Sequence, residues 1–164
     1  AHVLLLAALL TCFWASSGTA AAQDESATPT VSVERQEALA GKSVDVPVQV
    51  SGFTDVGAIS LIVTYDPEVL QFAKGMDTEA LISGVPRDNF SANVVKPGEL
   101  RIAWFDVSGS SPIEIDDGTL LKITFHRYAG GKSPVAFAEG SEIGNIEAKS
   151  VGVTFQDGQV VRGS

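Results

Sequence analysis

The sequence has few of the residue types from which catalytic and metal sites are built. Cys12 is its only cysteine, and His2 and His126 are its only histidines. It contains no G-x-S-x-G, H-E-x-x-H or phosphate-loop motif. A lone histidine on the outward face of a strand, such as His126, is far more often a surface residue than a base or a ligand. The sequence therefore offers no catalytic group of residues and predicts a non-enzymatic chain.

Basic residues are also scarce, with 11 Lys and Arg against 20 Asp and Glu, for a net charge of -9. An acidic surface repels phosphate backbones, so nucleic acid is not an expected partner. Most of the carboxylates lie in turn-like positions such as Asp66 before Pro67, where they serve local hydrogen bonding.

Two chemical uses of the acidic residues stay open at the level of sequence. A carboxylate pair across a cleft would make the chain a small glycoside hydrolase. Glu114, Asp116 and Asp117 could form a weak calcium site, although they lack the D-x-D-x-D-G spacing of an EF-hand loop. A solvated turn is the more economical interpretation, so no metal site is predicted in this chain.

The N-terminal 22 residues have the pattern of a secretory signal peptide. An uncharged apolar run at 3–15 is short for a membrane span, and Ala20 and Ala22 fit the small-x-small cleavage rule. We expect cleavage after Ala22 and a few missing residues before position 1. The alternatives are a retained membrane anchor, or lipidation of Cys12. Cleavage predicts a secreted, extracellular chain with no cysteine and no membrane span.

Residues 23–30 form a polar linker, and residues 31–162 form a single domain of short strands between turn signals. Roughly nine strands at near-even spacing predict an all-β fold, a nine-stranded antiparallel β-sandwich. One or two helical turns are expected within 76–83, a turn at Asp117-Gly118, a loop at 144–148 and a hairpin about Asp157-Gly158. The predicted strands are 30–34, 41–52, 58–66, 69–75, 91–95, 99–109, 119–128, 135–140 and 150–161.

Alternation along three of these strands predicts a binding face. Ile59, Leu61 and Val63 point to the core with Tyr65, and Trp104 shares the inward face of its strand with Leu100 and Ile102. The outward positions mix apolar and polar side chains, as protein-binding surfaces do. They are Ala58, Ser60, Ile62, Thr64, Arg101, Ala103, Phe105, Lys122 and Thr124. A slip of one residue would expose Trp104 instead and favour a sugar-binding platform.

Five segments together resemble a cohesin module, the receptor half of the cohesin–dockerin pair. They are "GKSVDVPVQVSG" (41–52), "GAISLIVTYDPEVLQF" (57–72), "GELRIAWFDVSG" (98–109), "DGTLLKITF" (117–125) and "SVGVTFQDGQVV" (150–161). Each segment alone is weak evidence for the resemblance, but the five segments together cover residues 31–161 in the order and at the spacing of the family.

The resemblance implies a nine-stranded jelly-roll sandwich without catalytic activity. It implies binding of a calcium-loaded dockerin on another protein, such as a polysaccharide-degrading enzyme, in a cellulosome or at a cell surface. It places the binding face on the sheet around 58–64, 101–105 and 120–126. The chain itself would be a monomer without a cofactor.

One departure from the family is visible on the proposed face. The best-known cohesins carry Asn and Asp where this chain has Ala58 and Ser60. Fewer polar groups at these positions suggest a different partner specificity, with more weight on apolar contact. The runner-up interpretation is a carbohydrate-binding jelly-roll module, which needs several coplanar Trp or Tyr side chains.

Overall fold

The computed structural model describes residues 28–73 and 89–164, and it contains strands and turns but no helix within those ranges. None of the described residues therefore forms an apolar helix that could cross a membrane. The predicted signal peptide, most of the linker and the helical turns at 76–83 lie outside the described residues. The strands are β1 Thr30–Val33, β2 Gln36–Ala38, β3 Ser43–Tyr65, β4 Leu70–Phe72, β5 Ser91–Lys96, β6 Glu99–Phe105, β7 Ile113–Arg127, β8 Ser133–Phe137, β9 Glu142–Asn145, β10 Ser150–Val151, β11 Thr154–Gln156 and β12 Gly158–Arg162.

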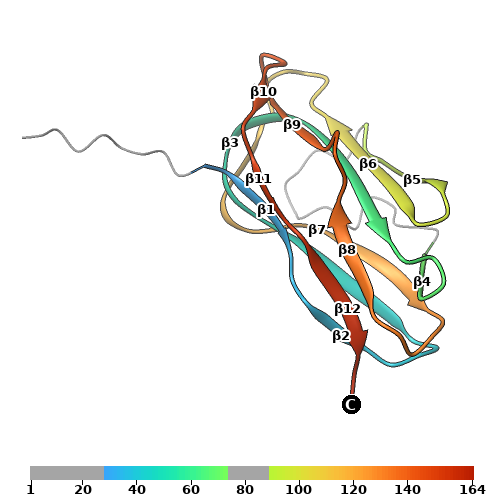
Figure 1. Cartoon of the computed structure of the whole chain (residues 1–164). Coiled ribbons are helices and arrows are strands. Elements are labelled where there is room, and N and C mark those ends of the chain that lie inside the picture. The colour runs from blue at the N-terminus through green and yellow to red at the C-terminus, as the bar shows by residue number, and fades with distance from the viewer. Residues whose placement is uncertain (1–27, 74–88) are drawn as a thin grey trace, which may run out of the picture.

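The longest strand, β3, runs through both layers of a sandwich (Figure 1). Its first half pairs with β1 and β7, and its second half pairs with β6, β8 and β9. The register with β7 shifts between Phe53 and Val56, where Asp55 has φ 54°. Bulges of this kind bend a strand. The strands predicted at 41–52 and 58–66 are therefore one continuous, bent strand.

The two layers share β3 and otherwise contain different strands. One layer has the order β4-β7-β3-β1-β11. In the other layer β5 and β6 lie on one side of β3, and β8 and β9 pair with its other side. There β10 continues from β9, and β12 and β2 continue from β8. The predicted all-β sandwich is confirmed. The described residues form twelve strands rather than nine. The predicted strand 150–161 is divided into β10, β11 and β12, two predicted strands are joined in β3, and β2 and β9 lie where no strand was predicted. Two edge pairs, β1–β11 and β12–β2, are parallel rather than antiparallel.

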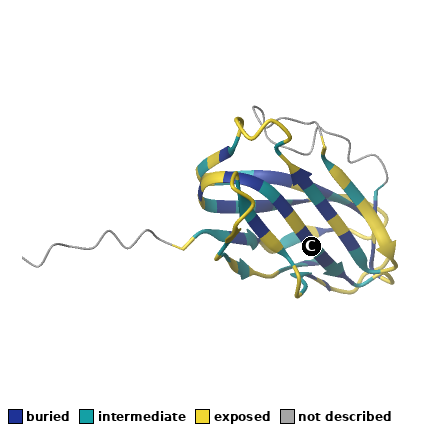
Figure 2. Ribbon diagram, turned by 90° about the horizontal axis from the view of Figure 1, so that it is seen from above, coloured by how far each residue is buried: buried dark blue, intermediate teal, exposed yellow. Residues whose placement is uncertain are grey.

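The core lies between the two layers and consists of alternate side chains from each strand (Figure 2). Both halves of β3 contribute, with Val46 and Val48 from the first and Leu61 and Val63 from the second. Each such buried aliphatic side chain stabilises the fold by about 1.5–3 kcal/mol relative to exposure. This burial leaves the alternate side chains of each layer on an outer face, where a partner can reach them.

The Tyr65-Asp66-Pro67 corner is structural, as its turn chemistry predicts. The amides of Val69 and Leu70 donate to the Asp66 carbonyl oxygen at 3.1 and 2.9 Å. The Asp66 carboxylate accepts a hydrogen bond from the Glu68 amide at 2.9 Å. An aspartate that binds an amide two residues ahead stabilises a turn of this type. The corner ends β3 and directs Leu70 back into the core.

Both Asp-Gly predictions are wrong. Asp117 and Gly118 lie inside β7, opposite the first half of β3. Gly158 begins β12, which pairs with β8 and β2 and not with β11. A Cβ at Gly158 would lie 2.3 Å from the carbonyl oxygen of Val33. Glycine is present there because two backbones approach closely, not because a hairpin turns there.

The segment 144–148, predicted as loop, is partly a hairpin between β9 and β10. Gly144 pairs with Ser150, and the Asn145 side chain accepts hydrogen bonds from the amides of Glu147 and Lys149 at 3.0 and 2.9 Å. The sequence pattern missed this hairpin because its strands are too short to show a period.

Candidate partner-binding face

The second half of β3 and all of β6 form the centre of one outer face. Their antiparallel register places residues directly opposite one another in rows that continue into β5, β8 and β9. The rows, from the Phe105 end, are Phe105–Ala58–Gly144, Ser91–Ala103–Ser60–Glu142, Asn93–Arg101–Ile62 and Lys96–Glu99–Thr64–Ala136. We call this surface the β3–β6 face. It brings together seven of the nine residues proposed from sequence.

The facing of β6 is as predicted. The Phe105 side chain is 52% exposed, whereas Trp104 is 1% exposed and lies in the core. The alternative register that exposed Trp104 is therefore wrong. Tyr65 is buried as well and packs on Phe125, with ring centroids 4.9 Å apart. Neither side chain can contribute to a sugar-binding platform.

Lys122 and Thr124 do not belong to this face, which corrects the sequence prediction. They lie on β7, opposite Pro47 and Asp45, in the other layer of the sandwich. The Thr124 hydroxyl donates to the Asp45 carboxylate at 2.8 Å on that opposite surface. The error has a physical cause, since β3 pairs with β7 over Ser43–Val56 and with β6 only from Ala58 onward.

Two flanking strands add residues to the face that the sequence reasoning left out. Ser91 and Asn93 come from β5, and Glu142 and Gly144 come from β9. Alternation in "SANVV" indicates which β5 side chains share a side. The partner strand on each flank depends on long-range pairing, which alternation cannot supply.

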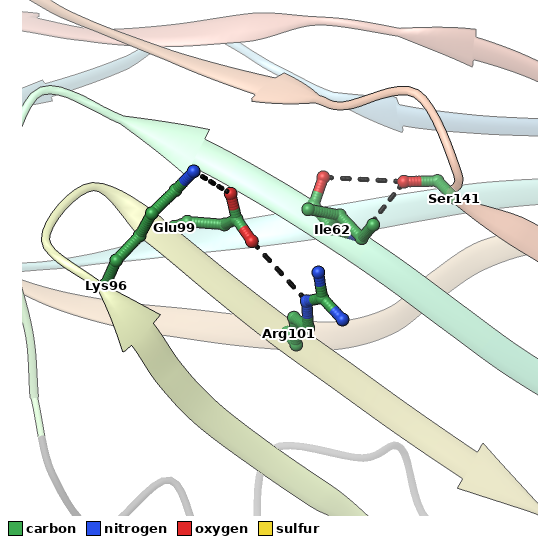
Figure 3. A network of polar contacts seen from close by, with 5 residues as sticks. All are labelled: Ile62, Lys96, Glu99, Arg101 and Ser141. Carbon is green, nitrogen blue, oxygen red and sulfur yellow. Dashed lines mark hydrogen bonds and ion pairs between the residues drawn. The ribbon is translucent and has the colours of Figure 1, made fainter.

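The middle of the face is held by a serine from the β8–β9 turn (Figure 3). The Ile62 amide donates to the Ser141 hydroxyl oxygen at 2.9 Å, and that hydroxyl lies 3.4 Å from the Ile62 carbonyl oxygen. The Ala138 amide also donates to the Ile62 carbonyl, at 2.7 Å. The neighbouring strand is interrupted here, and Ser141 satisfies the backbone groups that the ladder leaves unpaired. The backbone of the face is thereby fixed at its centre.

One end of the face carries a cluster of three charges, also drawn in Figure 3. The Glu99 carboxylate accepts from Lys96 Nζ at 3.0 Å and from Arg101 Nε at 3.4 Å. The hydrogen bond from Lys96 is the main cause that lowers the pKa of Glu99, and Arg101 adds to it. Glu99 is therefore ionised throughout the neutral range, and the cluster keeps one net positive charge.

The opposite end of the face is apolar and is followed by an ordered turn. The Asp106 amide donates to the Gly57 carbonyl oxygen at 2.8 Å, directly after Phe105. The Asp106 carboxylate accepts hydrogen bonds from the Ser108 hydroxyl and the Ser111 amide, which lower the pKa of Asp106. This turn sets the point at which β6 ends and Phe105 is exposed.

One of the acidic residues considered for metal binding, Glu114, has a structural role. The Glu114 carboxylate accepts a hydrogen bond from the Asp55 amide at 2.9 Å and so supports the bend of β3. Over residues 28–73 and 89–164, no group of three His, Cys, Asp or Glu residues has a geometry that could hold a metal ion. His126 packs edge-on against Tyr128, with ring centroids 5.8 Å apart.

Comparison with known proteins identifies the family. The cohesin domain profile matches residues 29–161, which is most of the chain. The chain belongs to the cohesin family. No curated protein is significantly similar to it in sequence. Cohesins are protein-binding modules without catalytic activity, so the expected absence of enzymatic function follows from the family.

Solved cohesins share the fold at low sequence identity. The sixth cohesin of scaffoldin B from Acetivibrio cellulolyticus, in complex with a Cel5 dockerin, is 24% identical with TM-score 0.73, covering 84% of this chain and 100% of that one. A non-cellulosomal cohesin from Archaeoglobus fulgidus is 24% identical with TM-score 0.67, and the match covers 84% of this chain and 93% of that one. The third cohesin ScaC of Acetivibrio cellulolyticus, in complex with a ScaB dockerin mutated in its C-terminal helix, is 17% identical with TM-score 0.69, covering 84% of this chain and 100% of that one.

Proposed function

We propose that this cohesin binds a calcium-loaded dockerin on another protein through its β3–β6 face. The observation that carries the proposal is the combination of the family match with an outer face whose largest apolar side chain, Phe105, is half exposed. Aromatic side chains are enriched at the energetic centres of protein interfaces. A sheet face stiffened at Ile62 by Ser141 also binds without a large ordering cost.

The partner is a dockerin-bearing protein such as a polysaccharide-degrading enzyme, and the setting is extracellular. The signal-peptide pattern of residues 1–22 supports this location. The calcium is expected on the dockerin, as the resemblance to cohesin–dockerin pairs implies. Direct sugar binding has little support, since it needs several coplanar Trp or Tyr side chains. Trp104 and Tyr65 are buried, and Tyr128 is the remaining half-exposed Tyr or Trp in the described ranges.

Titration calorimetry tests the proposed function directly. The chain is titrated with purified dockerin modules, including the Cel5 and ScaB dockerins of Acetivibrio cellulolyticus, in calcium and after chelation with EDTA. We expect one-to-one binding in calcium by at least one module, and loss of binding in EDTA, because the chelator removes the metal that folds the dockerin. Failure of every module to bind in calcium, together with retention on insoluble polysaccharide, would favour the carbohydrate-binding alternative.

A further inference from the structure

The positive end of the β3–β6 face is exposed and only partly neutralised. The side chains of Lys96 and Arg101 are 70% and 59% exposed, and both contact the single carboxylate of Glu99. Arg101 uses only Nε for this contact, so its two terminal amino groups make no hydrogen bond within the described part of the chain. On a chain of net charge -9, this is a local site suited to a carboxylate.

The other end of the face combines one large side chain with a floor of small ones. Phe105 lies opposite Ala58, Ala58 lies opposite Gly144, and the next row contains Ala103 and Ser60. Small residues rise little above a sheet, so the Phe105 ring is accessible on its edge and face to an apolar partner side chain. An aliphatic or aromatic group placed over Ala103 would contact Phe105 and remove it from water.

The flank formed by β9 has the opposite charge. Glu142 shares a row with Ala103 and Ser60 and is exposed. A partner that placed its carboxylate on this side would be repelled, whereas the same carboxylate over β6 would meet Arg101. Like-charge contacts of this kind exclude wrong orientations.

The distance between Arg101 and Phe105 determines how far apart two partner side chains must be to contact both residues. Arg101 and Phe105 are four positions apart on one strand, which corresponds to about 13 Å at the usual rise of a β-strand. Residues seven or eight positions apart on one face of an α-helix are separated by about 10–12 Å. A helix lying along β6 can therefore contact both ends of the face with two side chains at that spacing.

From this geometry we infer that the β3–β6 face selects a dockerin helix with an acidic residue and, seven or eight positions away, an apolar residue. The acidic side chain pairs with Arg101 and the apolar one packs on Phe105. The inference rests on the proposed function and adds the chemistry of the partner.

Selection from a dockerin library tests the inference. A calcium-loaded dockerin with randomised exposed helix positions is selected on the parent chain. We expect enriched binders to carry Asp or Glu and an apolar residue at this spacing. Arg101→Glu should weaken them by about tenfold or more, and a Lys at the acidic position of the binder should restore affinity for that variant. Lys122→Glu, the same charge change on the opposite layer, is the matched control and should leave the affinity unchanged.

Two other results would contradict the inference, and only the second would also contradict the proposed function. If the selected binders bind the parent and Arg101→Glu equally well, the inferred acidic contact is overturned while dockerin binding stands. If the library gives no binder to this chain but gives binders to the scaffoldin B cohesin of Acetivibrio cellulolyticus, both the proposed function and the inference are overturned. A thermal unfolding curve for Arg101→Glu should match the parent, because Arg101 is exposed.

Discussion

Replacing Arg127 with methionine is expected to lower the free energy of unfolding by about 3 kcal/mol. Arg127 ends β7, is fully buried and lies among backbone carbonyls rather than carboxylates. Its guanidinium donates to the carbonyl oxygens of Ala38, Val161 and Gly131. These acceptors come from the ends of β2 and β12 and from the β7–β8 turn, so one side chain ties three segments together.

The magnitude follows from two opposing effects. Methionine cannot donate a hydrogen bond, so three carbonyl oxygens each lose a donor. Each of them that water cannot reach lowers the stability by about 1–3 kcal/mol. The substitution also removes a buried charge and an Nε atom that has no hydrogen-bond partner within the described residues. This removal offsets part of the lost stability.

Chemical denaturation of the parent and the variant measures the difference in unfolding free energy. Thermal unfolding should show a fall in melting temperature of about 10 °C. Arg35→Met is the matched control, because Arg35 is exposed and pairs only with Glu37 in the described residues. Equal stability of Arg127→Met and the parent would show that the carbonyl cluster does not depend on this side chain.

Replacing Phe105 with alanine is expected to weaken dockerin binding by about 30-fold, which corresponds to about 2 kcal/mol. The truncation removes the largest apolar contact of the β3–β6 face. Stability should hardly change, because Phe105 is already about half exposed and Trp104 on the inward side is unaffected. Calorimetry with a dockerin that binds the parent gives the affinity, and thermal unfolding gives the stability.

Leu39→Ala is the control for Phe105→Ala. Leu39 is 51% exposed, almost as much as Phe105, but follows β2 and lies off the face. It should leave the affinity unchanged. Ile62→Asp, at the centre of the face, should weaken binding as Phe105→Ala does. If Phe105→Ala and Ile62→Asp both bind the dockerin as the parent does, the partner uses another surface.

Local pattern was sufficient to predict which side chains of a strand share a face. Alternation placed Trp104 inward and Phe105 outward, and both placements are confirmed. It also identified the Tyr65-Asp66-Pro67 corner, because an aspartate turn uses contacts within four residues. These features depend on interactions between residues that are close together in the sequence.

Features that depend on distant backbone contacts could not be predicted in this way. Gly158 has the sequence context of a hairpin, but its role is to admit the carbonyl oxygen of Val33. Lys122 and Thr124 have the alternation of face residues, but β3 bends between its pairing with β7 and its pairing with β6. Alternation gives the side of a sheet and not the identity of the neighbouring strand.

We propose that the outer face of β3 and β6 is the dockerin-binding surface. Backbone amide NMR of the isotope-labelled chain, recorded with and without a saturating calcium-loaded dockerin, tests it residue by residue. We predict that the shifts change along Ala58–Thr64 and Glu99–Phe105, with Ser91 and Asn93 of β5 affected as well. Changes confined to the opposite layer, around Asp45 and Lys122, would contradict the account.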